Sequence, residues 1–258
     1  MKVLITSGGT TEKIDEVRKI KNMASGMLGS LIAEEFLKQS EADITYVCSR
    51  DAITPADSEI ETVKIESVSE LAKALTKLLM ENKFDAVIHA MAVSDYAVRH
   101  VISAADLSAV ISESIHSKRE FGNDPDDTVK AIHTAILQSR AIIDSDKKIS
   151  SDIDNLVIVM DKTPKVIQII KQLQPDTVLV GFKLLVDASE SKLLEVGHNL
   201  LMRNICDFVL ANDLKQIHGD YHTGMLINPD YSYQLFHSKQ EIAHGIVVSV
   251  LKKIGGNR

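Results

Sequence analysis

The chain opens with the stretch KVLITSGGTT at residues 2–11, in which an apolar run is followed by two glycines. An uninterrupted apolar run of this kind is typical of a strand that is buried on both faces of a parallel sheet. Gly8 and Gly9 would let the backbone turn tightly after that strand and approach a phosphate group closely. The loop matches neither the G-x-G-x-x-G pattern nor the G-x-x-x-x-G-K-[ST] pattern, so an ordinary strand-to-helix turn remains an alternative.

Short β-rich runs, several of them continuously apolar, recur along the chain with amphipathic helical patterns between them. We expect strands at residues 2–6, 44–48, 60–65, 86–90, 156–160, 177–181 and 208–211. Capping boxes that begin at Ser67 and Ser238 predict two of the helices, and Thr163-Pro164 predicts a third helix start with proline in the first helical position. The alternation predicts an α/β protein with an open, mostly parallel, Rossmann-like sheet and helices on both faces.

Two regions break the alternation. Residues 224–237 predict a C-terminal hairpin, because two short apolar segments flank turn residues at positions 228–232. Residues 97–146 form an excursion without a catalytic pattern, which we interpret as an element that shapes a dimer or covers the site. No repeat or linker interrupts the chain, so we expect a single domain over residues 1–258.

Composition narrows the class of protein. The chain has 258 residues and a formal net charge of -7, which disfavours a non-specific binder of nucleic acids. Cys48 and Cys206 lie in apolar runs, so we expect reduced, buried thiols. No secretion signal is apparent, and no apolar run reaches the about 18 residues that a membrane span needs. We therefore expect a cytoplasmic protein with no membrane partner.

Cations lie close to an expected helix start. Arg18, Lys19 and Lys21 precede Ser25-Gly26, which opens an amphipathic helix. The unpaired N–H groups of a helix N-terminus attract anions, and nearby cations strengthen such a site. A simple serine N-cap with solvated lysines is the alternative.

Other candidate residues follow the expected strands, where ligands bind in open α/β sheets. Asp95 comes shortly after residues 86–90 and either belongs to a site or caps the next turn. We interpret His89, inside the strand, as a packed core histidine. Lys147-Lys148 forms a basic loop that would close over a phosphate or remain solvated. His218 and His222 are four residues apart without an apparent third ligand, so we predict no protein metal site.

Taken in order, these segments resemble phosphopantothenate–cysteine ligase, the bacterial enzyme of coenzyme A synthesis. The matching segments cover nearly the whole chain, at residues 6–12, 15–18, 22, 25–29, 90–96, 148–151, 161–167, 180–183 and 207–214. Their ordered combination is more specific than any one motif. Because the chain begins at the ligase part, it resembles the standalone form and not the fusion with a flavin-dependent decarboxylase.

The resemblance implies a reaction and its partners. Family members condense 4′-phosphopantothenate with L-cysteine, and bacterial members use CTP through an acyl-cytidylate intermediate, giving phosphopantothenoylcysteine, CMP and pyrophosphate. The resemblance also implies Mg2+ with the CTP co-substrate, a homodimer, and a separate phosphopantothenoylcysteine decarboxylase in the pathway. A carboxylate that attacks an α-phosphate needs Mg2+ and lysine to neutralise the triphosphate.

The resemblance also implies roles for individual residues. Catalytic roles fall on Asn22, which handles the substrate carboxylate and the acyl intermediate, on Lys148 in a mobile flap, and on Arg18. Nucleotide contacts are implied for Gly8, Gly9, Asp95, Lys148, Pro164, Lys165, Val166, Ile167, Phe182 and Arg203. Substrate contacts are implied for Asn22, Ser25, Gly26, Met91 and Ala92. Ser150 and Ser151 depart from the family, because many members carry lysines there, and His198 and Asn199 occupy the region of a second expected cation.

Two alternatives stay open. An NAD(P)-dependent Rossmann-type oxidoreductase would use the same sheet, although the missing third glycine in the first loop counts against it. A nucleotide-sensing or scaffold protein would bind CTP without turnover, and the joint presence of Asn22, Asp95 and Lys148 disfavours it.

Overall fold

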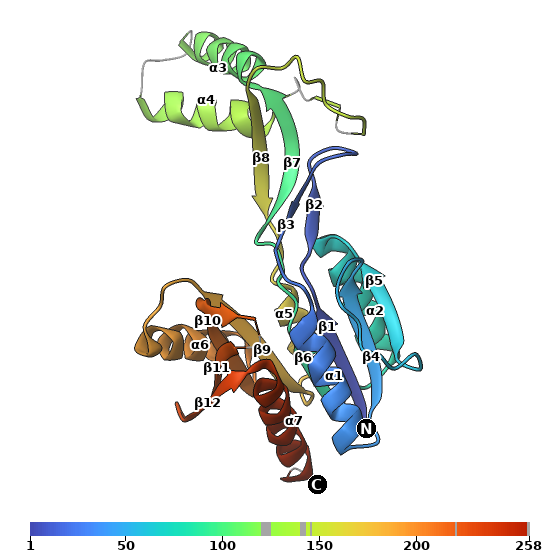
Figure 1. Ribbon diagram of the computed structural model, residues 1–258. Coiled ribbons are helices and arrows are strands. Elements are labelled where there is room, and N and C mark those ends of the chain that lie inside the picture. Colours follow the sequence, from blue (N-terminus) through green and yellow to red (C-terminus); the bar gives the residue numbers. More distant parts are fainter. Residues whose placement is uncertain (120–124, 140–142, 145, 220, 257–258) are drawn as a thin grey trace. The chain divides into compact units, whose positions relative to one another are not determined.

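The computed structural model describes residues 1–119, 125–139, 143–144, 146–219 and 221–256 (Figure 1). The chain divides into two compact units. The first unit consists of Met1–Thr10, Asn22–Val93 and Lys165–Arg258, and the second consists of Thr11–Lys21 and Ser94–Pro164. Where we expected one domain with an excursion over residues 97–146, the second unit contains that excursion, extends it at both ends and adds residues 11–21.

The first unit is built on an eight-stranded sheet. Its strands are β1 (Lys2–Ser7), β4 (Asp43–Ser49), β5 (Glu61–Ile65), β6 (Ala86–His89), β9 (Val178–Leu185), β10 (Phe208–His218), β11 (Tyr221–Ile227) and β12 (Tyr233–Ser238). Their order is β12-β11-β10-β9-β6-β1-β4-β5, and the six strands from β10 to β5 are parallel. The antiparallel pair β11–β12 confirms the expected C-terminal hairpin, and the sheet confirms the predicted Rossmann-like class.

β1 lies where the strand order reverses. The chain runs from β1 to β4 and β5 on one side, and from β6 to β9 and β10 on the other. Val3, Leu4 and Ile5 are fully buried, which is the reason that this strand has no polar face. In such a sheet the crevice at the carboxyl ends of the strands beside the reversal is the usual place for a ligand.

Helices cover both faces of this sheet, as predicted. α1 (Met27–Gln39) and α7 (Lys239–Gly256) lie together on one face, where Val3 and Ile5 of β1 join their core (Figure 1). α2 (Val68–Glu81), α5 (Val166–Leu173) and α6 (Glu190–Asn204) cover the other face, where Leu4 joins their core. Alternate residues of β1 therefore supply the two cores, as the period of a strand requires.

Of the helix starts expected at Ser67, Ser238 and Thr163-Pro164, the first two are confirmed. The Ser67 hydroxyl accepts a hydrogen bond from the N–H of Glu70 at 3.1 Å, and the Ser238 hydroxyl does the same for Glu241 at 3.1 Å. The start at Thr163-Pro164 is wrong. α5 begins at Val166, because the Thr163 hydroxyl instead donates to the carbonyl of Ser94 at 2.6 Å in the second unit.

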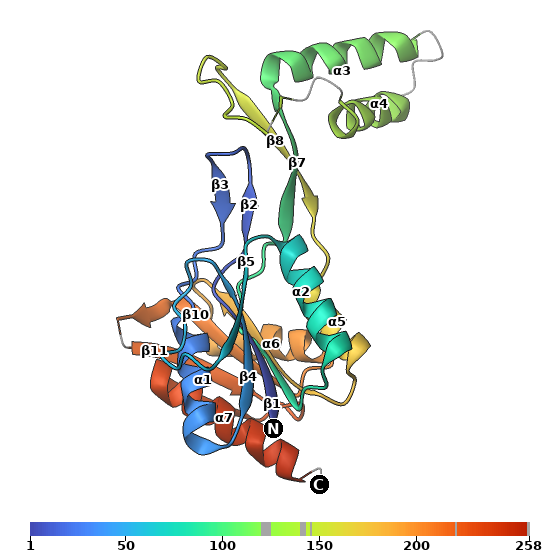
Figure 2. The same ribbon diagram turned by 90° about the vertical axis from the view of Figure 1, so that its right-hand side faces the viewer.

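The second unit contains two short antiparallel sheets and a helix pair. β2 (Thr11–Lys13) pairs with β3 (Lys19–Lys21), and β7 (Tyr96–Ser103) pairs with β8 (Leu156–Lys162). α3 (Ala104–Arg119) packs along α4 (Pro125–Leu137), as Figure 2 shows. The strand expected at residues 156–160 exists, but its assignment to the parallel sheet is wrong. An apolar run alone does not specify a partner, and this run finds one in β7.

Both cysteines are free and buried, as expected. Burial raises the pKa of Cys206 to about 12, so its thiol stays protonated at neutral pH. Among the described residues no helix is long and apolar enough to cross a membrane.

Candidate functional site

A cavity of about 300 Å3 opens within the first unit, at the carboxyl ends of β1 and β6. It is lined by Ser7, Gly8, residues 23–29, residues 90–92, Phe182, Leu184, Asn212, Leu214, Ile217, His222 and Lys239. Gly8, Ser25, Gly26, Met91, Ala92 and Phe182 were all expected as site residues, and the structure brings these six together. A larger hollow of about 540 Å3 lies beside residues 79–85 and 173–178, and none of the expected site residues lines it.

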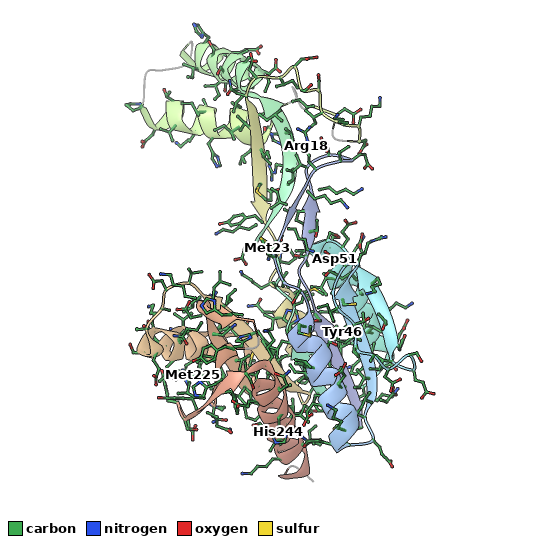
Figure 3. The ribbon with its side chains drawn as sticks, viewed as in Figure 1. Arg18, Met23, Tyr46, Asp51, Met225 and His244 are labelled. Atoms are coloured by element: carbon green, nitrogen blue, oxygen red, sulfur yellow. The ribbon has the colours of Figure 1, made fainter. Side chains whose placement is uncertain are left out.

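The N-terminus of α1 forms one wall of the cavity. Gly26 is the N-cap residue, and its φ of 81° is a conformation that residues with a Cβ rarely adopt. No side chain of the N-cap residue satisfies the first-turn N–H groups, and the first turn carries no acidic residue. The Ser25 hydroxyl accepts only a long, 3.4 Å bond from the N–H of Met27. Met23, labelled in Figure 3, also lines the cavity and is almost fully exposed. This wall therefore offers uncompensated donors to an anion.

A buried hydrogen-bonded chain holds the loop after β6. The N–H of Met91 donates to the Thr6 hydroxyl at 3.3 Å, and that hydroxyl contacts Nδ1 of His89 at 2.9 Å. Burial lowers the pKa of His89 to about 4, so its ring is neutral at pH 7. The burial of His89 confirms its interpretation as a packed core histidine, and through Thr6 it also supports the loop at Met91.

The site prediction missed several cavity residues, among them three with polar side chains, Asn212, His222 and Lys239. The side-chain amide of Asn212 contacts Nε2 of His222 at 2.9 Å. Nδ1 of His222 is buried without a hydrogen-bond partner, and burial lowers the pKa of His222 to about 4. The ring is thus neutral, and Lys239 is the charged residue among the described lining residues. The signal that identifies Asn212 is its position directly after the apolar run 208–211.

Gly9 and Asn22 lie against each other beside the cavity. A Cβ built on Gly9 would stand 2.0 Å from the backbone oxygen of Asn22, so only glycine permits this approach. The N–H of Asn22 donates to the carbonyl of Thr10 at 3.1 Å, which closes the strand-like contact between the two segments. The second glycine of the opening motif is therefore explained by packing of protein backbone.

Other expected nucleotide residues of the first unit do not line this cavity. Lys165 is the N-cap of α5, and Val166 is buried in the core on that face of the sheet. Ile167 packs against the same core. Arg203 is exposed in the last turn of α6.

The remaining expected residues belong to the second unit. Asp95 is exposed, and its backbone carbonyl accepts a hydrogen bond from the N–H of Thr163 at 3.0 Å. The strand β7 follows Asp95, where a helix or turn cap was the alternative. Pro164 ends this unit, and Lys148 is exposed in the segment before β8.

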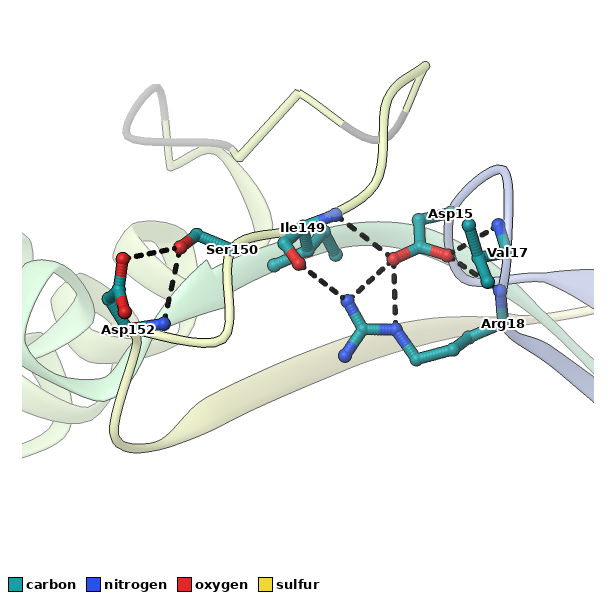
Figure 4. Close-up of polar contacts among 6 residues, drawn as sticks. All are labelled: Asp15, Val17, Arg18, Ile149, Ser150 and Asp152. Carbon is teal, nitrogen blue, oxygen red and sulfur yellow. Dashed lines mark hydrogen bonds and ion pairs between the residues drawn. The ribbon is translucent and has the colours of Figure 1, made fainter.

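Arg18 makes specific contacts within the second unit. Its Nε and Nη2 donate to Oδ2 of Asp15 at 2.9 and 2.6 Å, and Nη2 also donates to the carbonyl of Ile149 at 3.1 Å (Figure 4). The guanidinium holds the pKa of Asp15 well below its usual range. Among the described residues no group of three or more His, Cys, Asp or Glu side chains is arranged to hold a metal ion.

Several curated proteins that resemble this chain carry the same name. The coenzyme A biosynthesis bifunctional protein CoaBC of Thermococcus kodakarensis is 29% identical over 94% of this chain and 49% of its own length. The CoaBC protein of Methanocaldococcus jannaschii is 27% identical over 98% of this chain and 51% of its own length. The chain thus spans about half the length of the curated relatives it matches.

A solved structure shares the whole fold. The DNA/pantothenate metabolism flavoprotein from Streptococcus pneumoniae superposes with a TM-score of 0.79 and 29% identity, and each chain is covered to 100%. The family model described as DNA/pantothenate metabolism flavoprotein C-terminal domain matches residues 1–106 and 98–254. These matches lend no support to the nicotinamide-dependent oxidoreductase alternative. The chain belongs to the family of the C-terminal domain of DNA/pantothenate metabolism flavoproteins.

Proposed function

We propose that the protein joins 4′-phosphopantothenate to L-cysteine at the expense of CTP. The observation that carries this proposal is the family match along nearly the whole chain, together with a cavity that gathers six of the expected site residues. Relatives are named for coenzyme A biosynthesis, and a solved Cab2 variant of the same fold is a complex with phosphopantothenate-cysteine. That neighbour has a TM-score of 0.68 and 17% identity, so it supports the fold.

The proposed reaction has two displacement steps. The carboxylate of phosphopantothenate attacks the α-phosphorus of CTP, and the bond to pyrophosphate breaks to give an acyl-cytidylate. The cysteine amine then attacks the acyl carbon, loses a proton and expels CMP. We treat Mg2+ as part of the CTP co-substrate, where it neutralises phosphate charge.

Residues of this chain bind the phosphate groups, neutralise their charge and stabilise the intermediate in these steps. The N-terminus of α1 supplies N–H donors for a phosphate group, and Phe182 supplies an apolar wall for a base. Lys148 neutralises charge on the triphosphate, and the Asn22 amide stabilises the oxygen of the acyl intermediate. Arg203 and Asp95 stay assigned to the nucleotide.

Pyrophosphate release tests the proposed reaction. We expect continuous release only when phosphopantothenate, L-cysteine, CTP and Mg2+ are all present. Without L-cysteine we expect a single turnover, because the acyl-cytidylate is then not consumed. No pyrophosphate with all four present would refute the activity. Replacing CTP by ATP in the same assay measures nucleotide preference.

Two variants test the assigned residues. Lys148→Ala should slow turnover about 100-fold or more, the scale of one preorganised charge or donor, while its exposed neighbour variant Lys147→Ala should keep the wild-type rate. Asn22→Asp should lower turnover more than it lowers the free energy of unfolding. A near-normal rate in either variant would remove that residue from the site.

We also propose a homodimer that works in the cytoplasm beside a separate decarboxylase. The two free, buried cysteines suit a reducing compartment. Sedimentation equilibrium should give twice the mass of 28.4 kDa. A monomer at micromolar concentration with full activity would contradict the dimer.

A further inference from the structure

We propose that Asp15 and Arg18 form an anchor for the segment that carries Lys148, so that Arg18 acts as a positioning residue through this segment. The role given to Lys148 rests on the proposed function. The anchor itself rests on contacts within the second unit (Figure 4).

The anchor begins in the loop between β2 and β3. Oδ1 of Asp15 accepts from the N–H groups of Val17 and Arg18, at 2.8 and 2.6 Å, and this fixes the loop on the carboxylate. Asp15 is 1% exposed. A buried carboxylate is tolerated when it is paired and fully hydrogen-bonded, and the Arg18 guanidinium completes that requirement at Oδ2.

The same pair holds both backbone groups of Ile149. The N–H of Ile149 donates to Oδ2 of Asp15 at 3.1 Å, and its carbonyl accepts from Nη2 of Arg18 at 3.1 Å. The Ile149 side chain is 2% exposed, so the residue is held by packing as well. Contacts that only stabilised the β2–β3 loop would not need a residue 131 positions away in the sequence.

The anchored segment is also fixed on its other side. The Ser150 hydroxyl donates to Asp152 at 3.0 Å, and the N–H of Asp152 donates back to that hydroxyl at 3.2 Å. Lys148 is exposed and directly precedes Ile149. Its Cα is therefore held by the peptide that joins it to the anchor, while its side chain stays accessible.

An anchored base matters for a lysine that acts as a point charge. The flexible four-carbon stem of lysine gives little directional control, so control must come from the backbone. A displacement of about 1 Å in a catalytic group costs roughly 100-fold in rate. The competing interpretation is that Arg18 contacts substrate directly, and the two interpretations predict different couplings.

A double-mutant cycle in the full-length protein separates them. Asp15→Asn and Arg18→Lys are each made alone and with Lys148→Ala, and kcat and KM for pyrophosphate release are measured. We expect each single variant to lower kcat about 10-fold or more with KM for phosphopantothenate within about twofold. On the Lys148→Ala background the further loss should be under about twofold, because the lost lysine has nothing left to position.

The outcomes are decisive in both directions. Multiplicative losses, or a raised KM for phosphopantothenate, would overturn the proposal and favour direct substrate contact. Full activity in Lys148→Ala would overturn it as well. Asp154→Asn, an equivalent change on an exposed carboxylate of the same segment, should keep the wild-type kcat.

Hydrogen exchange at the Ile149 amide gives a readout without turnover. The amide should exchange about 10-fold or more faster in Asp15→Asn than in the wild type, and at the wild-type rate in Asp154→Asn. Unchanged exchange in a folded Asp15→Asn protein, or in Arg18→Lys if Asp15→Asn does not fold, would refute the anchor. A wild type that releases no pyrophosphate would instead refute the proposed function, and the exchange result would still decide the anchor.

Discussion

Replacing Gly9 by alanine tests the physical reason for the opening glycine motif. A Cβ at this position would lie 2.0 Å from the backbone oxygen of Asn22, 3.0 Å from its carbonyl carbon and 3.3 Å from its Cβ. Ordinary contacts of a Cβ begin at 3.4 Å, so the two backbones must separate. No side-chain rotation relieves a clash with backbone atoms. The bond from the Asn22 N–H to Thr10, 3.1 Å long, would be strained or lost.

The expected cost follows from these contacts. Overpacking a well-filled region costs about 1–3 kcal/mol, and a disrupted hydrogen bond adds about 1 kcal/mol. We therefore expect Gly9→Ala to lower the free energy of unfolding by about 2–4 kcal/mol. Urea unfolding followed by circular dichroism measures this change as a lower midpoint with an unchanged slope.

A matched control and a refuting result complete the test. Gly255→Ala places a Cβ in open space near the end of α7, so it should leave stability unchanged or raise it by up to about 1 kcal/mol. If the free energy of unfolding of Gly9→Ala lies within about 0.5 kcal/mol of the wild-type value, the close approach to Asn22 does not explain this glycine. A phosphate contact would then be the better reason for it.

Three further expectations concern the core and the helices. Because burial lowers the pKa of His89 to about 4 while the unfolded chain titrates near 6.5, the unfolded state binds the extra proton first and stability is lost as pH falls between these values. Between pH 7 and pH 5 the free energy of unfolding, measured with urea, should therefore fall by about 2 kcal/mol less in His89→Asn than in the wild type. An identical pH dependence in the variant would contradict this. Ser67→Ala should cost about 1 kcal/mol through loss of the α2 cap, measured by thermal unfolding, and no change in midpoint would mean that the cap is energetically silent. Gly245→Ala should destabilise strongly, because its Cβ would lie 2.1 Å from the Phe236 ring, and a second substitution of Phe236→Leu should recover part of the loss in the same assay.

Much of the first unit was predictable from local patterns. Short β-rich runs identified seven strands, of which six lie in the main sheet. The continuously apolar ones, such as β1, are buried on both faces and so have no polar positions. The loops after these strands identified Gly8, Met91 and Ala92 correctly as neighbours, since carboxyl ends of parallel strands meet at one edge.

The second unit shows where local patterns stop. The apolar run at residues 156–160 predicts a strand, but it pairs with β7, whose first residue Tyr96 lies 66 positions before its partner Lys162. Strand pairing is a non-local choice, and nothing in a single run specifies its neighbour. The short β2–β3 hairpin was missed for a related reason, since three-residue strands carry too few positions to show a period.

Sequence by itself determined the class of sheet, both confirmed helix caps, the packed core histidine at His89 and the family resemblance. Tertiary structure alone decided that His222 and Lys239 line the cavity and that the Asp15–Arg18 pair binds the backbone of Ile149. The physical reason is separation along the chain. Hydrophobic periodicity and helix capping act within about two helical turns or one strand, so a short stretch of sequence is enough to predict them. The buried carboxylate of Asp15, by contrast, meets the backbone of Ile149 only in the folded chain, because the two residues are more than a hundred positions apart.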